Sequence, residues 1–212
     1  MEAVGDRKQA ASVYKQMLEL LPNDFYSKLQ LGRLYGELGQ AATAEPLLQQ
    51  ATRQRQSVPD AWVELGNVQM MLKKYGEALE SYTQGLKLRP QEPAYLCFQA
   101  NALARLNRNR EAIAAYRRAI QIRADQPQTH FELAGLLAAE NEVAEAMREY
   151  NEAIRLNPQY VVSHINLGVM LFRQNRLDEA IQQFQTALQL EPGNAAAADY
   201  LRQTKERRPE KK

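Results

Sequence analysis

An alanine recurs in this chain at intervals of 34 residues, six times in succession. The alanines are Ala10, Ala44, Ala78, Ala112, Ala146 and Ala180. Four residues after each comes a large ring or branched apolar side chain: Tyr14, Leu48, Tyr82, Tyr116, Tyr150 and Phe184. A period of this length, held over most of a chain, predicts a stack of similar helical units that bury their apolar faces against one another.

Each unit contains two helical patterns when position 1 is set at Phe25, Pro59, Pro93, Pro127 and Val161. In the first pattern, positions 4, 7, 8 and 11 share one face of a helix. Position 8 is always small: Gly32, Gly66, Ala100, Ala134 and Gly168. We expect this residue to let the second helix of the unit approach closely, because helix axes come within about 8 Å only at small contacts.

Turn signals separate the helices. Position 15 holds Gly39, Asn107, Asn141 and Asn175, which tolerate the left-handed conformation that ends a helix. Lys73 is the exception, and we expect Gly76 to supply that turn. Position 32 holds Pro22, Pro90, Pro158 and Pro192, and proline stops a helix. Gln56 and Ala124 lack this signal, which predicts two less sharply specified junctions.

These residues resemble the tetratricopeptide repeat, whose pattern reads W-x2-L-G-x2-Y, then A-x3-F-x2-A, then P. The matching residues of one unit are Trp62, Leu65, Gly66, Ala78, Tyr82 and Pro90, whereas Gln69 and Gly85 depart from the pattern. The resemblance extends from residue 5 to about residue 205. It implies an all-α fold, a right-handed superhelical solenoid of antiparallel helix pairs, whose first helices line the concave side.

The register divides the chain into eight segments. They are an N-terminal half repeat with a second helix only (1–24), five full repeats (25–58, 59–92, 93–126, 127–160 and 161–194), a C-terminal capping helix (195–206) and a basic tail (207–212). Gly5 falls on position 15, so the segment from Met1 to Val4 is expected to end a preceding first helix. We interpret this half unit as the result of a cut from a longer protein; evolutionary trimming is the alternative.

Composition excludes several classes. The net charge of the 212 residues is +2, and the tail from Lys205 to Lys212 carries five Lys or Arg and two Glu. The body is therefore nearly neutral, and nucleic acid is not an expected partner. Cys97 is the single cysteine, so an internal disulfide is ruled out. No apolar run approaches the ~18 residues of a membrane span, and no signal peptide opens the chain, which favours a soluble, cytoplasmic protein.

No pattern of catalytic residues is recognisable. The sequence lacks a glycine-rich phosphate loop, an H-E-x-x-H, a C-x-x-C and a G-x-S-x-G motif. His130 and His164 both occupy position 4, one repeat apart, which places them about 10 Å from each other, too far to share a metal ion. We interpret both as packing residues, Cys97 as an inert thiol, and the chain as a protein without enzymatic activity, metal or cofactor.

A second stripe runs along the first helices at positions 2, 5, 9 and 12, away from the core stripe, and it is apolar at positions where a one-sided helix would be polar. In the family that this chain resembles, the stripe lines the ligand groove; the alternative is that position 5 packs between neighbouring first helices. The candidate partner-binding residues are Leu29, Arg33, Val63, Asn67, Met70, Cys97, Asn101, Arg105, Phe131, Ile165, Asn166, Val169, Phe172 and Arg173.

The resemblance also allows a negative prediction. Cochaperones of the family bind a terminal carboxylate with lysine at position 5, asparagine at position 9 and further cations at positions 2 and 6. Here no position 5 is lysine, a carboxylate would meet Val63 and Glu64 where it needs cations, and Asn67 and Asn101 alone match. Carboxylate binding of that kind is therefore not expected. Glycosyltransferase arrays of the family carry asparagine at position 6, and only Asn166 fits.

The sequence thus predicts a scaffold whose groove holds an apolar or amphipathic segment of a partner protein, most simply a helix. The asparagines would bond its polar groups, and Arg105 and Arg173 would contact acidic residues at its rim. Two other hypotheses stay open: a targeting or regulatory domain cut from a larger enzyme such as a glycosyltransferase, and a homo-oligomer that assembles through the incomplete N-terminal unit.

The first full repeat carries the weakest sequence. Pro46 lies in its second helix, where we expect it to be tolerated only within the first turn. Thr52 and Gln54 stand where other repeats have two apolar residues, such as Leu86 and Leu88. We therefore predict that residues 42–56 are the least stable part of the array.

Overall fold

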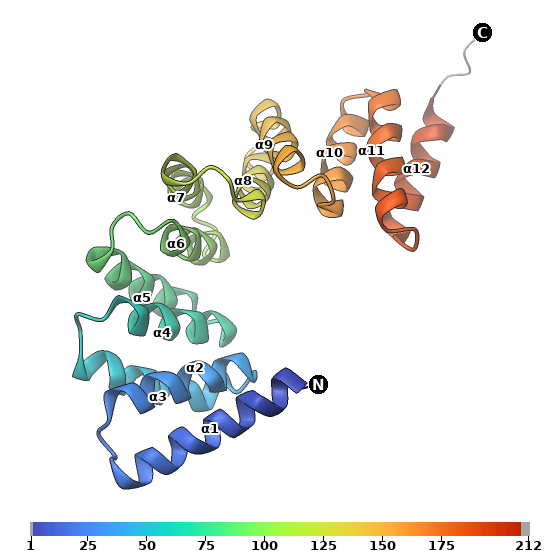
Figure 1. Cartoon of the computed structure of the whole chain (residues 1–212). Coiled ribbons are helices and arrows are strands. Elements are labelled where there is room, and N and C mark those ends of the chain that lie inside the picture. The colour runs from blue at the N-terminus through green and yellow to red at the C-terminus, as the bar shows by residue number, and fades with distance from the viewer. Residues whose placement is uncertain (1, 209–212) are drawn as a thin grey trace. The chain divides into compact units, whose positions relative to one another are not determined.

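The computed structural model describes residues 2–208, and the side chains from residue 6 onward; residues 209–212 of the expected basic tail lie outside this range. Within it the chain forms twelve α-helices and no strand. The helices pack in sequence, each against the next along the chain within a compact unit (Figure 1). The expected all-α array of helix pairs is confirmed.

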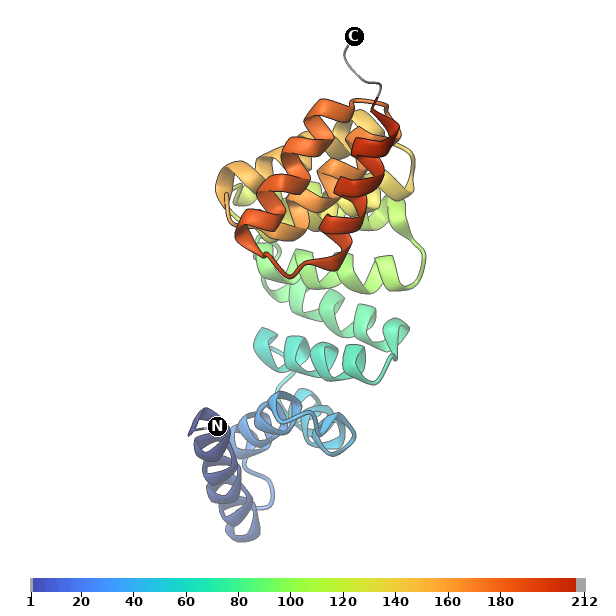
Figure 2. The ribbon, with the colours of Figure 1, turned by 90° about the vertical axis from the view of Figure 1, so that its right-hand side faces the viewer.

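The chain divides into two compact units, one up to Ile122 and one from Arg123. The first unit holds α1 (Glu2–Leu20), α2 (Phe25–Glu37), α3 (Ala41–Gln54), α4 (Pro59–Met71), α5 (Tyr75–Leu88), α6 (Pro93–Arg105) and α7 (Asn109–Ile122). The second unit holds α8 (Pro127–Ala139), α9 (Val143–Leu156), α10 (Val161–Arg173), α11 (Leu177–Leu190) and α12 (Ala195–Arg207). In Figure 2 the last of these, α12, lies alongside α11.

The core of each repeat lies where position 8 faces the large side chain that follows the alanine by four residues, a set of residues called here the ring column. A Cβ atom added to Gly66 would lie 2.5 Å from Tyr82 Cε1, and one added to Gly168 would lie 2.6 Å from Phe184 Cε1. The expected role of the small residue, to admit the second helix, is thereby confirmed. The alanine column is equally enclosed, because its members in the five full repeats, Ala44 through to Ala180, are 0% exposed.

All five full repeats close the first helix in the same way. The residue at position 15 has a positive φ, between 58° and 75°, and the N–H of position 16 donates to the carbonyl of position 11. The expectation that Gly76 replaces Lys73 in this role is wrong, because Lys73 itself adopts a φ of 60°. The Lys74 N–H bond to the Gln69 carbonyl, 2.8 Å long, closes the turn and offsets the cost of a left-handed lysine.

Proline does not decide where the second helices end. These helices finish at Leu20, Gln54, Leu88, Ile122, Leu156 and Leu190, always two residues before position 32. The junctions at Gln56 and Ala124 are therefore as sharp as those with proline, contrary to the expectation from sequence.

Side chains at position 4 bind three of these junctions. Trp62 Nε1 donates to the Gln56 carbonyl at 2.9 Å, and His130 Nε2 lies 3.0 Å from the Ala124 carbonyl. His164 makes the same 3.0 Å contact with the Pro158 carbonyl. In these three junctions a ring nitrogen from the next first helix thus satisfies a backbone carbonyl that lies two residues beyond the helix end.

The ends of the array differ in part from expectation. α1 runs without interruption from Glu2 through Gly5, so residues 2–4 do not end a separate helix; Met1 lies outside the described residues. Glycine permits a left-handed turn but does not require one. At the other end, α12 forms as predicted, and Tyr200 stacks on Phe184 with ring centroids 5.5 Å apart.

Pro46 lies deeper in α3 than expected. It is the sixth residue of the helix, beyond the first turn, and the helix continues to Gln54. Because proline has no N–H to donate, the carbonyl of Ala42 loses its helical partner. Burial of Leu48 and Ala51, both 0% exposed, holds the helix together despite this loss.

We expect Pro46→Ala to stabilise the protein by about 1–3 kcal/mol, because Pro46 is exposed and the substitution restores a helical hydrogen bond. Ala114→Pro, at the same repeat position in α7, should destabilise by about 3 kcal/mol. Urea denaturation measures both changes. Hydrogen exchange should show faster exchange over residues 42–56 than over α5, and slow exchange there would contradict the assignment of α3 as the weakest helix.

We expect the stability of the chain to depend on the ionisation of His130. Its Nδ1 lies 2.6 Å from Glu149 Oε2, and this carboxylate raises the pKa of His130. A raised folded-state pKa means that the stabilisation is complete below the usual pKa of about 6.5. It is lost as the pH rises through the raised value. Urea midpoints measured between about pH 6 and pH 9 should therefore decline.

A reciprocal pair of variants isolates this pair of side chains. His164 occupies the equivalent site, but its Nδ1 faces the amide oxygen of Gln183 at 2.7 Å. Glu149→Gln copies that arrangement and should reduce the fall of the urea midpoint with rising pH. Gln183→Glu should add a second fall of the midpoint in the same direction. A wild-type pH profile that survives Glu149→Gln would exclude His130 as its source.

Candidate functional site

A cavity of about 510 Å³ lies on the side of the first unit that is formed by the first helices α2, α4 and α6. Its lining combines aromatic and aliphatic side chains with a few charged and amide groups. The lining residues are Phe25, Tyr26, Leu29, Gln30, Arg33, Val58, Asp60, Val63, Glu64, Asn67, Tyr95 and Phe98. Such a mixture, apolar with few polar groups, is usual in binding sites.

Four of the sequence-predicted residues meet in this cavity: Leu29, Arg33, Val63 and Asn67. Four others of the first unit, Met70, Cys97, Asn101 and Arg105, are not part of its lining. Position 5 is largely enclosed, with Leu29 8% and Val63 6% exposed. That burial favours the packing alternative for these two residues, which leave only their edges to the cavity.

One wall of the cavity carries a paired acid. Asp60, at the start of α4, accepts a hydrogen bond from the Tyr95 hydroxyl and pairs with Arg89 Nη1 at 3.3 Å. Burial, and then the hydrogen bond to Asp60, raise the pKa of Tyr95 to about 12. Tyr95 therefore stays a neutral donor at physiological pH, and the charge of Asp60 is balanced by Arg89.

Glu64 faces the same cavity without such a partner. The described residues place no cation within 4.0 Å of its carboxylate, although they include Arg33 in the lining. Asn67 Nδ2 lies 3.4 Å from Glu64 Oε2, and Asn67 Oδ1 accepts from the Tyr82 hydroxyl at 2.9 Å. Burial raises the pKa of Glu64, against smaller opposing effects of Asn67 and Arg33.

The asparagines predicted to contact a partner also have a role within the fold. Asn101 Oδ1 accepts from the Tyr116 hydroxyl at 2.7 Å, as Asn67 does from Tyr82. Asn166 Nδ2 donates to the Tyr150 hydroxyl at 3.2 Å. Each asparagine therefore satisfies a tyrosine of the ring column, whose hydroxyl lies in a largely buried environment.

The predicted residues of the second unit lie on α8 and α10. Phe131 is half-buried, with ring centroids 5.8 Å from Tyr150 and 5.2 Å from Tyr160. Ile165 is 9% exposed and belongs to a small core with Ala187 and Ala197, against which Val169 packs. Phe172 is half-buried beneath the guanidinium of Arg207, 5.1 Å from its ring centroid, and Arg173 is exposed.

Sequence reasoning missed several residues of the cavity. Tyr26 and Asp60 occupy position 2, while Gln30, Glu64 and Phe98 occupy position 6. The signal was present at position 6, because a large apolar residue such as Phe98 is unexpected on an exposed helix face. Tyr26, 60% exposed, is the most open large apolar side chain of the lining.

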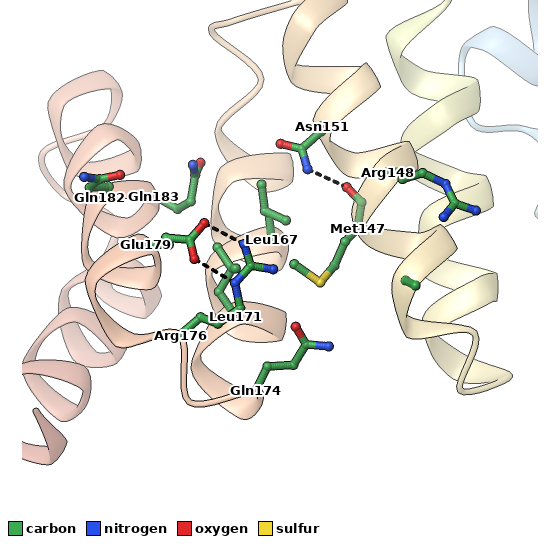
Figure 3. Close-up of a pocket in the computed structure, with 11 residues that line it drawn as sticks. Met147, Arg148, Asn151, Leu167, Leu171, Gln174, Arg176, Glu179, Gln182 and Gln183 are labelled. Carbon is green, nitrogen blue, oxygen red and sulfur yellow. Dashed lines mark hydrogen bonds and ion pairs between the residues drawn. The ribbon is translucent and has the colours of Figure 1, made fainter.

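A second cavity, of about 370 Å³, lies between α9 and α11 (Figure 3). Met147 points toward Leu167 and Leu171, and Arg176 forms a two-pronged ion pair with Glu179. A cavity of about 410 Å³ between α5 and α7 is lined at corresponding repeat positions, including the Arg108–Glu111 pair. We conclude that this groove follows from the repeat geometry and is not specific to one site.

The residues that the structure describes contain no group of three or more His, Cys, Asp or Glu that could hold a metal ion. His130 and His164 have both ring nitrogens engaged within the fold, as expected for packing histidines. None of the helices described is long and apolar enough to cross a membrane.

Comparison with known proteins agrees with this architecture. The family model of the cilia and flagella-associated protein 70 C-terminal domain, a tetratricopeptide-repeat domain, matches residues 1–205. No curated protein sequence matches the chain significantly.

Several solved structures share the fold at low sequence identity. YrrB, a TPR protein with an unusual peptide-binding site, is 18% identical with a TM-score of 0.72, over 89% of this chain and 97% of its own. A chain of the APC/C hetero-tetramer Cut9–Hcn1 is 16% identical with a TM-score of 0.74, over 95% of this chain and 40% of the other. TTC0263 of Thermus thermophilus is 20% identical with a TM-score of 0.64, over 86% and 100%.

Identities this low establish the fold alone. The family model, in contrast, covers nearly the whole sequence, in agreement with the 34-residue register and with the packing of Gly32, Gly66 and Gly168 against Leu48, Tyr82 and Phe184. The chain therefore belongs to the tetratricopeptide-repeat family of the cilia and flagella-associated protein 70 C-terminal domain.

Proposed function

We propose that the chain is a non-catalytic scaffold that binds a partner protein. The cavity between α2, α4 and α6 holds an apolar or amphipathic segment of that partner, in helical form. The observation that carries the proposal is the lining itself, in which Tyr26, Phe98 and the edges of Leu29 and Val63 surround about 510 Å³ of open space.

The size and chemistry of the cavity suit a helix face. Anchoring side chains at i, i+3 or i+4 and i+7 of an amphipathic helix would bury apolar area against these residues. Gln30, Asn67 and Arg33 lie among them and supply polar contacts that orient the segment.

The relatives support the same class of function. Among the similar structures, YrrB has a peptide-binding site, and Cut9–Hcn1 is a complex between two proteins. The family takes its name from a protein associated with cilia and flagella, which supports a partner in those organelles.

The remaining predicted residues would extend the contact. In the first unit these are Met70, Cys97, Asn101 and Arg105; in the second they are Phe131, Ile165, Asn166, Val169, Phe172 and Arg173. Exposed Arg105 and Arg173 are suited to acidic groups at the rim of the bound segment.

Selection from a phage-displayed peptide library tests the proposal. Wild type should select peptides with apolar residues at helical spacing. Tyr26→Ala should then weaken their affinity at least about tenfold, measured by fluorescence anisotropy, because it removes the aromatic ring from the wall of the cavity. Phe131→Glu tests the second unit, with helical content followed by circular dichroism because Phe131 packs against two tyrosines.

Met71→Ala is the matched control for Tyr26→Ala. Met71 is 51% exposed at the end of α4, near the exposure of Tyr26, and does not line the cavity. Equal binding by Tyr26→Ala and wild type, or equal losses in Tyr26→Ala and Met71→Ala, would remove the cavity from the proposal.

A second candidate function is self-association through the incomplete N-terminal unit. α1 carries Val13, Met17 and Leu20 at helical spacing, with 54%, 40% and 82% of their surfaces exposed, and Leu21 follows at 60%. In the full repeats the corresponding helix packs against the first helix of its own repeat. A second copy of α1 could cover this apolar face.

Analytical ultracentrifugation tests this candidate. Wild type should form dimers at high concentration, and Leu20→Glu should remain monomeric because it places a charge in the interface. Leu88→Glu, at the same repeat position in α5 and 41% exposed, should dimerise like wild type. A wild-type chain that stays monomeric at high concentration would eliminate the candidate.

A further inference from the structure

Two acidic side chains near the cavity, Asp60 and Glu37, form ion pairs, whereas a third, Glu64, forms none with the residues that the structure describes. Arg89 Nη1 lies 3.3 Å from Asp60 Oδ1, and Arg33 Nε lies 3.9 Å from Glu37 Oε1. Glu37 is itself held by Arg7 at 3.0 Å. Glu64 lines the cavity and has no ion pair among the residues that the structure describes.

This carboxylate is held in place from the core of the repeat. Tyr82 is 2% exposed, packs against Gly66 and stacks on Phe98 with ring centroids 5.6 Å apart. Its hydroxyl donates to Asn67, whose amide in turn reaches Glu64. The site is therefore arranged before any ligand arrives, which lowers the entropic cost of binding.

The aromatic wall of the cavity already attracts a cation. The guanidinium carbon of Arg55 lies 4.7 Å from the ring centroid of Phe25 and 5.1 Å from that of Tyr26. Aromatic faces stabilise guanidinium and ammonium groups through the ring quadrupole. The rings and Glu64 together therefore provide the two features that select a positively charged side chain.

We infer that the bound segment inserts a lysine or arginine side chain into this cavity, where its cationic group pairs with Glu64 and its aliphatic stem lies along Tyr26 and Phe98. The inference rests on the proposed function, because it specifies one residue of the segment that the cavity holds. It also reverses the preference of a carboxylate clamp: the cavity selects a cation of the partner.

Electrostatics favour this occupant over the alternatives. An apolar side chain would complete the burial of Glu64 and leave it without a counter-charge, which is strongly unfavourable. A carboxylate of the partner would be repelled by it. A lysine or arginine of the partner pairs its charge with the Glu64 carboxylate and buries its aliphatic stem in the same contact.

The second unit supplies a matched control. Glu132 occupies the same repeat position as Glu64, on α8, but it accepts a hydrogen bond from the Gln128 side chain and does not line this cavity. Glu64→Gln and Glu132→Gln are both isosteric, so neither should alter helical content. Circular dichroism checks this for both variants before binding is measured.

The experiment starts from the peptides that the phage library yields with wild type. Their consensus should contain one Lys or Arg at a constant place among the apolar positions. Selection with Glu64→Gln should keep the apolar pattern and lose the basic residue, whereas Glu132→Gln should keep both. Glu64→Lys should favour an acidic residue at that place.

A synthetic peptide from this consensus then gives the coupling between the two charges. Glu64→Gln should bind its arginine form about tenfold more weakly than wild type does. Replacing that arginine by citrulline, which is neutral and nearly isosteric, should weaken binding to wild type by a similar factor. Glu64→Gln combined with the citrulline peptide should lower the affinity little more than either change alone.

The pH dependence provides a further readout. Because burial raises the pKa of Glu64, the free site takes up a proton at a higher pH than an ordinary glutamate does. Affinity for the arginine peptide should therefore fall as the pH drops through that pKa, and Glu64→Gln should show no such fall. The citrulline peptide should bind wild type with little pH dependence.

The outcomes separate this inference from the proposed function. An apolar consensus without a basic residue would overturn the inference and leave the proposed function standing. Equal loss in Glu64→Gln and Glu132→Gln, or independent effects of Glu64→Gln and citrulline, would also overturn it. Failure of wild type to select any helical apolar pattern would overturn both.

Discussion

The contact between a small residue and a large ring or branched side chain, made within each repeat, is the constraint on which the structure depends. Gly32, Gly66 and Gly168 lie so close to the side chains above them that an added Cβ would fall 2.5–2.6 Å from the nearest carbon atom. Interiors packed at this density tolerate little extra volume. The contact therefore sets the distance between the two helices of a pair, and the remaining residues occupy faces that this distance defines.

The same contact connects the core to the candidate site. Tyr82 is fixed by Gly66 and Phe98, and its hydroxyl orients Asn67, which reaches Glu64 at the cavity. Tyr82, which belongs to the repeat pattern, thus positions Glu64, which does not, through Asn67. The Tyr116 hydroxyl donates to Asn101 in the same way, whereas Asn166 of the following repeat donates to the Tyr150 hydroxyl. The neighbouring residues differ, and Glu64 alone of position 6 combines a carboxylate with this cavity.

The junctions show a similar division between pattern and context. Proline marks four ends of second helices, yet all six end at the same repeat position. The ring nitrogens of Trp62 and His130 bind the carbonyls of Gln56 and Ala124, and His164 makes the same contact at Pro158. His130 and Trp62 were recognisable as core residues from their position. Their hydrogen bonds to a carbonyl six residues earlier depend on how the chain turns between helices, which a linear pattern does not contain.

The sequence by itself determined the helices, their register, the small and ring columns and most of the residues that close the first helices, because these depend on spacings within 34 residues. It also predicted Leu29, Arg33, Val63 and Asn67 as site residues, which the cavity brings together. Only the tertiary structure decided that position 5 is mostly buried, that Asn67 accepts a hydrogen bond from Tyr82, that Lys73 adopts the left-handed turn, and that Glu64 forms no ion pair with the residues that the structure describes. Those outcomes depend on which side chains of neighbouring helices are in contact. These contacts are set by packing distances between helices, which the sequence of a single repeat does not specify.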